Sequence, residues 1–135
     1  MKLSTKAKYG LNACITLAER YESGMISISE LSRETGTTEG YLEQIMALLR
    51  KANVVVTQRG AQGGYQLAKT PAETSVGELL RAVEDNLEIV ECISGKCASN
   101  HVCKSRPVWV KLYQNINHYL DSISLQQLID ESKGA

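Results

Sequence analysis

The chain has 135 residues, a net charge of zero, 43% apolar residues and four cysteines. This length accommodates one to one-and-a-half domains and excludes a large enzyme scaffold. No apolar run approaches the roughly 18 residues of a membrane span. The basic start runs into Leu11–Ala18, which contains Asn12 and Thr16 and indicates an amphipathic helix rather than a signal peptide. We therefore expect a cytoplasmic protein without membrane contact. With only His101 and His118 and no nucleophile paired with a base, the sequence offers no catalytic constellation, and we expect no enzyme.

The net charge conceals an asymmetry between the two halves of the chain. Residues 1–70 contain nine basic and six acidic residues, a balance of +3, whereas residues 71–135 contain six basic and nine acidic residues, a balance of −3. A mildly basic first half is compatible with phosphate binding, although many solvated surfaces have the same composition.

The first fifty residues predict three helices. Apolar residues at helical spacing start after Ser4 or Thr5 and stop at Gly24. Ser27 and Glu30 have the spacing of a capping box, which opens a short helix that stops at Gly36. A third helix is expected from Thr38, with its apolar face formed by Leu42, Ile45, Met46 and Leu49. Two short helices joined by a glycine turn are typical of a helix-turn-helix.

A hairpin and three further helices are expected next. The β-favourable runs Val54–Thr57 and Tyr65–Leu67 flank a glycine-rich segment, and a hairpin placed directly after a helix-turn-helix is a wing. Ser75 and Glu78 form a second capping box, Pro107 suits a helix start, and Ser124 can cap a last helix. The helix after Pro107 has an apolar stripe of Trp109, Leu112, Tyr113, Ile116 and Leu120. So much exposed apolar surface indicates dimerisation.

The expected fold class is therefore mainly α with a small β-hairpin wing. We divide the chain into a winged helix-turn-helix over residues 1–85, a cysteine-rich loop over residues 86–105, and a dimerisation helix with a C-terminal helix over residues 106–135. A two-fold symmetric dimer predicts a palindromic operator in double-stranded DNA, with half-sites about one or two helical turns apart.

Seven residues are candidate DNA contacts. Gln44 can bond adenine, and Glu43 can accept a hydrogen bond from the cytosine amino group. Thr38, Tyr41 and Lys51 can reach phosphates. The wing tip carries Arg59 and Gly60, and an arginine on such a tip can enter a narrow minor groove. The alternative is a small helical bundle with a polar face and a solvated turn arginine.

The cysteines form two different sets. Cys92, Cys97 and Cys103 lie within twelve residues of polar sequence that has little apolar material to bury. They can hold an iron–sulfur cluster, form a Cys₃His zinc site with His101, or remain free reactive thiols. Cys14, in contrast, lies on an apolar helical face and is expected to be a small buried hydrophobe.

Four segments, in this order, resemble the iron–sulfur cluster regulator (IscR) family of dimeric winged-helix transcription regulators. They are residues 2–10, Tyr41–Ile45, Arg59–Tyr65 with its Arg-Gly-x-x-Gly-Gly-Tyr pattern, and the three cysteines. The resemblance covers Met1 to about Leu128. It implies that Cys92, Cys97 and Cys103 are the thiolate ligands of a cluster, commonly [2Fe–2S], whose state alters DNA affinity.

The resemblance also implies roles on the DNA side. Tyr41, Glu43 and Gln44 would lie in the major groove and Arg59 in the minor groove. An acidic residue at the position of Glu43 can act as a selectivity gate that tolerates one operator class and repels another.

The fourth cluster ligand departs from the family pattern. Relatives use a histidine where this chain has Arg106, or an acidic side chain of the partner subunit where it has Lys8. A protonated guanidinium or ammonium has no lone pair to donate, so His101 is the nearest substitute and Asn12 a weaker one. An incompletely ligated cluster would be labile, and a [4Fe–4S] form is also allowed. A zinc-stabilised regulator and a cluster-free regulator that senses through a partner protein remain the alternatives.

Overall fold

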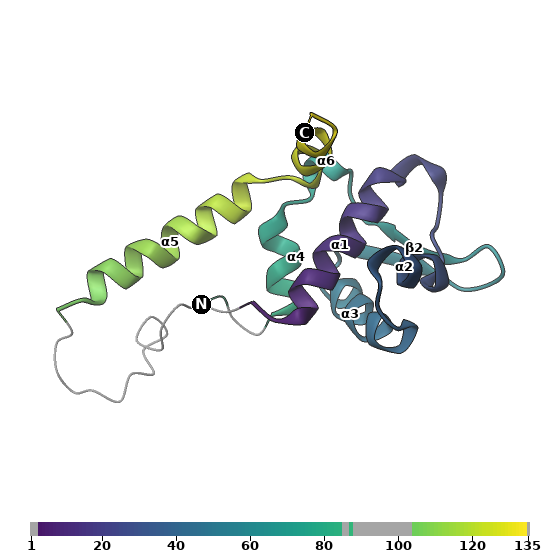
Figure 1. The fold of residues 1–135 in the computed structure, drawn as a ribbon, viewed down its shortest axis with the longest axis horizontal. Helices are drawn as coiled ribbons and strands as arrows, with labels where there is room; N and C mark the ends of the chain where they lie inside the picture. The colour runs from purple at the N-terminus through teal and green to yellow at the C-terminus, as the bar shows by residue number, and fades with distance from the viewer. Residues whose placement is uncertain (1–2, 85–86, 88–103, 135) are drawn as a thin grey trace.

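The computed structural model describes residues 3–84, 87 and 104–134, which form a helical head and a long helix that extends from it (Figure 1). The helices and strands are α1 (Thr5–Glu19), α2 (Ile28–Thr35), α3 (Glu39–Lys51), β1 (Val55–Gln58), β2 (Gly64–Leu67), α4 (Val76–Val83), α5 (Arg106–Ser122) and α6 (Leu125–Gly134). Short 3₁₀ turns lie at Tyr21–Ser23 and Pro71–Glu73. The predicted fold class, mainly helical with a hairpin wing, is confirmed.

The two predicted capping boxes form to different extents. At the start of α4, the Ser75 side chain accepts from the backbone N–H of Glu78, and the Glu78 carboxylate accepts from the N–H of Ser75. At the start of α2, the Ser27 hydroxyl accepts from the Glu30 N–H at 3.2 Å, but the Glu30 carboxylate pairs with Arg20 at 2.8 Å. This second box is therefore only half formed, because the charged side chain of Arg20, the residue after α1, lies within reach.

The core of the head surrounds α1, which packs against α2, α3, α4 and α6. Its largest fully buried side chains are Leu17, Leu31, Leu42, Ile45, Met46, Leu49, Leu79 and Leu125. The four apolar residues predicted for the inner face of α3 are all among them. Their burial fixes the rotation of α3 about its axis and leaves the opposite face of this helix in solvent.

The wing is an antiparallel pair whose register runs from Val55 opposite Leu67 to Gln58 opposite Gly64. A third segment joins it, since Ile26 and Tyr65 exchange two backbone hydrogen bonds of 2.9 and 2.8 Å. This close approach depends on Gly64, because a Cβ there would lie 2.3 Å from the Ile26 carbonyl oxygen. The glycine-rich wing thus joins the segment that precedes α2.

The last two helices differ in how closely they pack against the head. None of the seventeen residues of α5 is buried, whereas Leu125 and Ile129 of α6 belong to the core of the head. Residues on both sides of Ser124 pair with the segment at the start of α4: the N–H of Val76 donates to the carbonyl of Ile123 at 2.9 Å, and the N–H of Leu125 donates to the carbonyl of Thr74 at 3.0 Å. Although α6 follows α5 in the chain, it is therefore packed as part of the head.

The apolar stripe predicted along α5 is split between two directions. Tyr113 and Leu120 pack against the core of the head, while Leu112 remains 41% exposed. Two apolar residues outside the predicted stripe, Val108 and Tyr119, are 60% and 63% exposed. One edge of the predicted stripe therefore faces the head, while the other edge, with Leu112, adjoins a side of α5 that remains free. Among the described residues, no helix is both long and apolar enough to cross a bilayer.

Candidate nucleic-acid interface

The outer face of α3 carries three of the predicted DNA contacts. Glu43, Gln44 and Lys51 are exposed, on the side opposite the buried leucine, isoleucine and methionine residues of the helix. The acidic Glu39 lies in the first turn of the same helix, where its carboxylate accepts a hydrogen bond from the Ser29 hydroxyl at 3.1 Å. Donors, acceptors and charges of both signs are therefore displayed along one rigid element.

Thr38 and Tyr41 contribute to the structure of α3 as well as to its surface. Thr38 is the N-cap, and its hydroxyl oxygen accepts from the Tyr41 N–H at 3.2 Å. The same hydroxyl retains a proton that it can donate. The half-buried ring of Tyr41 meets the ring of Tyr9 edge-to-face, with centroids 6.0 Å apart. Part of the surface of Tyr41 is thus used to hold α1 against α3.

Arg59 and Gly60 lie in the exposed loop between the two strands of the wing. This loop projects from the head on the side away from α5 (Figure 1). Gly60 has a φ of +113°, a conformation that side chains rarely adopt, so the turn requires glycine. Within the part of the chain that the structure describes, Arg59 makes no ion pair or side-chain hydrogen bond. Its guanidinium is therefore available to a ligand.

Charged side chains on the outer face of α3 influence Tyr65 at the base of the wing. Burial raises the pKa of Tyr65, the carboxylate of Glu43 raises it further, and the guanidinium of Arg50 acts in the opposite direction. Arg50 is exposed and follows Glu43 by seven residues, so the two lie on the same side of α3. Arg50 was not among the predicted DNA contacts, although its spacing of seven residues from Glu43 on α3 is the signal that could have found it.

The predicted ligands Cys92, Cys97, Cys103 and His101 lie outside the described residues. The other cysteine, Cys14, is fully buried in the core, as expected. Burial, followed by the effect of the Glu78 carboxylate, raises the pKa of the Cys14 thiol to about 12. This thiol remains protonated at neutral pH and is a poor metal ligand.

The other positions considered for a fourth ligand lie on the surfaces of α1 and α5. Lys8 and Asn12 are exposed on α1, and Arg106 is the exposed first residue of α5. Among residues 3–84, 87 and 104–134, no group of three histidine, cysteine or acidic residues is placed to hold a metal ion.

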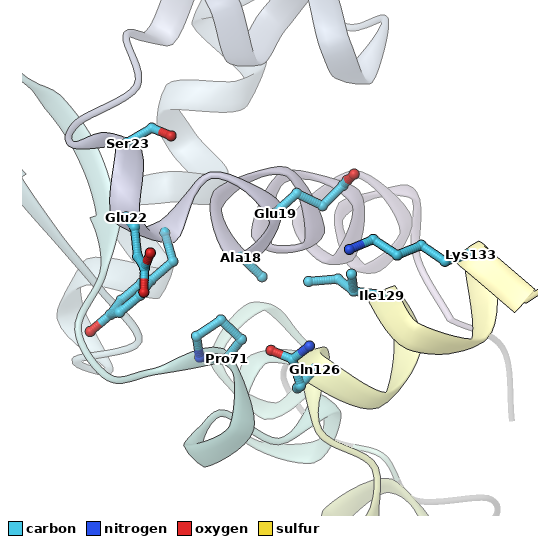
Figure 2. A pocket seen from close by; sticks show the side chains of 9 residues that line it. Ala18, Glu19, Glu22, Ser23, Pro71, Gln126, Ile129 and Lys133 are labelled. Carbon is cyan, nitrogen blue, oxygen red and sulfur yellow. The ribbon is translucent and has the colours of Figure 1, made fainter.

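A polar hollow of about 440 Å³ lies on the opposite side of α1 from α3, between the end of α1, Pro71 and α6 (Figure 2). Its lining is formed by Ala18, Glu19, Tyr21, Glu22, Ser23, Pro71, Gln126, Ile129 and Lys133. Neither the residues of the outer face of α3 nor those of the wing line it. The hollow is therefore separate from the candidate DNA surface.

A family model described as an iron-dependent transcriptional regulator, Rrf2, matches residues 3–131. The chain belongs to the Rrf2 family. The helix-turn-helix regulator IscR of Aliivibrio salmonicida is 33% identical over 135 residues, covering 98% of this chain and 80% of that protein. The resemblance to the iron–sulfur cluster regulators is thereby confirmed.

Two solved structures of Rrf2-type regulators share the fold. IscR of T. potens is 36% identical, with a TM-score of 0.81 over 98% of this chain and 88% of that one. CymR, the global cysteine regulator of B. subtilis, is 31% identical, with a TM-score of 0.84 over 97% and 98% of the two chains. This Rrf2 protein is accordingly a DNA-binding transcriptional regulator and not an enzyme.

Proposed function

We propose that this Rrf2 protein recognises a specific operator, with the outer face of α3 in the major groove and the wing in the minor groove. The observation that carries the proposal is the exposed polar face of α3 beside a wing whose tip cation is unpaired within the described residues. Gln44 and Glu43 would face base edges, and Thr38, Tyr41 and Lys51 would face phosphates. Arg59, positioned by the turn at Gly60, would enter the minor groove.

Glu43 would then act as a selectivity gate. A carboxylate in the major groove needs a donor such as the cytosine amino group, and it is repelled where only acceptors face it. The Glu43 carboxylate raises the pKa of Tyr65 and the Arg50 guanidinium lowers it, so charges of both signs lie at the base of the wing. Discrimination and attraction would thus come from neighbouring side chains.

The regulator would act as a homodimer joined along α5. Its free side carries the exposed apolar residues Val108, Leu112 and Tyr119, a surface that a second copy can cover. Two-fold symmetry would place the two heads on the half-sites of a palindromic operator, about one or two helical turns apart. In this proposal α5 is the dimerisation helix of the predicted segment over residues 106–135, while the C-terminal helix of that segment, α6, packs with the head.

Cys92, Cys97 and Cys103 would hold an iron–sulfur cluster, [2Fe–2S] or [4Fe–4S], in the segment over residues 86–105 that connects α4 to α5. Three thiols and His101 in a polar sequence are a suitable donor set, and relatives named IscR support the assignment. When bound, the group would supply a redox- and oxygen-sensitive centre. The buried thiol of Cys14 would take no part.

Purification without oxygen, followed by a visible spectrum and assays of iron, sulfide and zinc, tests the cluster. We expect a coloured protein with equal iron and sulfide, and we expect Cys97→Ala to remove the colour while Cys14→Ala retains it. A colourless protein with one zinc per chain would instead support a Cys₃His zinc site. Unchanged operator binding after replacement of all three cysteines would support a cluster-free regulator that senses through a partner protein.

A further inference from the structure

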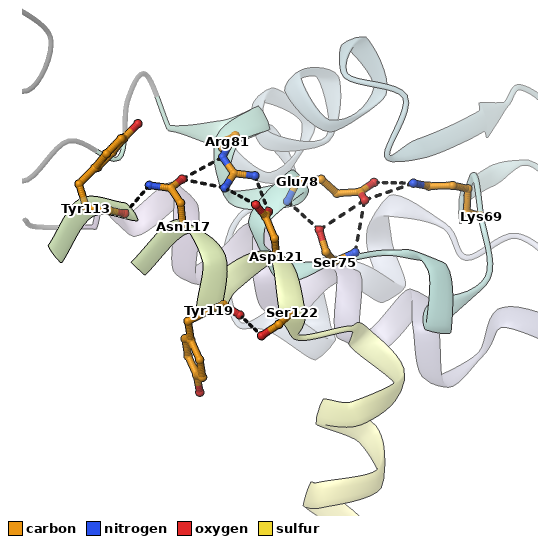
Figure 3. Close-up of polar contacts among 9 residues, drawn as sticks. All are labelled: Lys69, Ser75, Glu78, Arg81, Tyr113, Asn117, Tyr119, Asp121 and Ser122. Atoms are coloured by element: carbon orange, nitrogen blue, oxygen red, sulfur yellow. Dashed lines mark hydrogen bonds and ion pairs between the residues drawn. The ribbon is translucent and has the colours of Figure 1, made fainter. Parts of the chain in front are cut away.

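Arg81 on α4 joins the head to α5 through four polar contacts (Figure 3). Its guanidinium donates to the Asp121 carboxylate from Nη1 to Oδ1 at 2.6 Å and from Nη2 to Oδ2 at 3.1 Å. It also donates to Oδ1 of Asn117, from Nη2 at 2.7 Å and from Nε at 3.3 Å. A bidentate guanidinium–carboxylate contact fixes the relative orientation of two groups as well as their distance. We refer to Arg81, Asn117 and Asp121 as the α4–α5 clamp.

Gly77 makes room for this clamp. A Cβ at Gly77 would lie 2.2 Å from Oδ1 of Asp121 and 3.0 Å from Nη1 of Arg81. The carboxylate of Asp121 therefore occupies the space that any other residue at this position would fill. Because alanine is a better helix former than glycine, Gly77→Ala should displace Asp121 without weakening α4 itself.

A second attachment holds the end of α5. The backbone hydrogen bonds of Ile123 with Val76 and of Leu125 with Thr74 anchor the junction between α5 and α6 to the segment that starts α4. The clamp acts on α5 up to two turns before this junction. Two attachment points along one helix determine its direction, and α5 projects from the head in that direction (Figure 1).

The clamp and the free apolar side of α5 face opposite ways. Asn117 follows Val108 by nine residues, and Asp121 follows Leu112 by nine residues. At 3.6 residues per turn, nine residues correspond to a rotation of about 180°. One side of α5 is therefore held by the head, while the other side is free for a second copy.

We propose that the α4–α5 clamp is a positioning device that sets the spacing of operator half-sites accepted by the dimer. The proposal rests on the proposed function, a homodimer joined along α5 that binds a palindromic operator. A helix of 17 residues is about 25 Å long. A tilt of about 10° moves its far end by about 4 Å, more than the roughly 3.4 Å rise of one base pair. A change of this size in the direction of α5 would alter the separation of the two heads by about one base pair.

The experiment measures operator binding as a function of half-site spacing. An operator selected by the wild-type protein from random duplexes is altered by single-base-pair changes between its half-sites, and binding is measured by fluorescence anisotropy. The variants are Gly77→Ala, Arg81→Ala, and the exchange of Arg81→Asp with Asp121→Arg. Lys69→Ala is the matched control, because it breaks an ion pair to Glu78 of 3.1 Å that is similarly exposed but lies within the head (Figure 3).

We expect wild type and Lys69→Ala to prefer one spacing sharply. Gly77→Ala and Arg81→Ala should bind the operator of that spacing about threefold to tenfold more weakly than wild type does. Their affinity for operators of neighbouring spacings should rise relative to that value. Their affinity for a single half-site should not change. The exchange of Arg81→Asp with Asp121→Arg should restore the half-site spacing that wild type prefers. If Gly77→Ala does not fold, Arg81→Ala and the exchange decide the question.

Folded dimeric variants with the spacing profile of wild type would overturn the role of the clamp and leave the proposed function intact. A wild-type chain that sediments as a monomer, or that binds without regard to spacing, would instead refute the proposed function and the clamp's role together.

Discussion

Cys14 offers a direct test of which thiols are available for chemistry. Burial and the Glu78 carboxylate raise the pKa of this thiol from 9.0 to about 12. At pH 8 its thiolate fraction falls from about one in ten to about one in ten thousand, a roughly thousandfold decrease. Because the thiolate is the reactive form, native Cys14 should be alkylated by iodoacetamide at least about a thousandfold more slowly than in the unfolded chain.

The rate is measured by mass spectrometry of the peptide that contains Cys14, with the same chain in guanidinium as the control. A native rate within about tenfold of the unfolded rate would refute the reasoning. It would mean that the thiol opens to solvent and that Cys14 cannot be excluded from the ligand set on grounds of burial.

The same pKa shift has a consequence for alkaline stability. The fold favours the protonated thiol, so its contribution is fully present below pH 9 and is lost as the pH rises from 9 towards about 12. A shift of about three units corresponds to a loss on the order of 4 kcal/mol in the free energy of unfolding. Cys14→Ala, which costs about 1 kcal/mol at neutral pH through a small cavity, should lose less stability over this range. Equal losses in urea titrations of the two proteins between pH 8 and pH 11 would contradict this reasoning.

Three further predictions concern the DNA surface and the wing. Arg59→Ala should weaken operator binding by about 1–3 kcal/mol without changing thermal stability. The slope of the logarithm of the binding constant against the logarithm of the salt concentration should become shallower by up to about one unit. Unchanged affinity would contradict the placement of the wing in the minor groove. Glu43→Ala should relax the sequence preference measured by competition between operator variants. An equal loss of affinity for all sequences would contradict the role of Glu43 as a selectivity gate. Gly64→Ala should cost about 1–3 kcal/mol of stability in urea titrations, because the residue has a φ of +147° and a Cβ there would collide with the Ile26 backbone. Gly40→Ala, in open space on α3, is the control and should be neutral or stabilising.

Local patterns in the sequence were sufficient to predict most of the head. Apolar spacing, the Ser75–Glu78 box and the glycines of the wing act over a few residues, so their structural meaning does not depend on distant partners. The buried face of α3 and the burial of Cys14 followed from the same periodicity. The candidate residues on α3 and the wing could therefore be chosen in advance, while their roles on DNA remain predictions.

Other features were decided by contacts between segments that are far apart in the chain. Glu30 pairs with Arg20 instead of completing its cap, and Tyr65 joins the surroundings of Glu43 and Arg50 only because the wing folds against α3. The α4–α5 clamp depends on a carboxylate that reaches into the space above Gly77, forty-four residues earlier in the chain. Periodicity alone could describe α5 as an apolar stripe, but not divide it into a side held by the head and a side left free. Helical spacing specifies the angle between side chains of one helix, whereas the direction in which that helix faces is set by the packing of the whole fold.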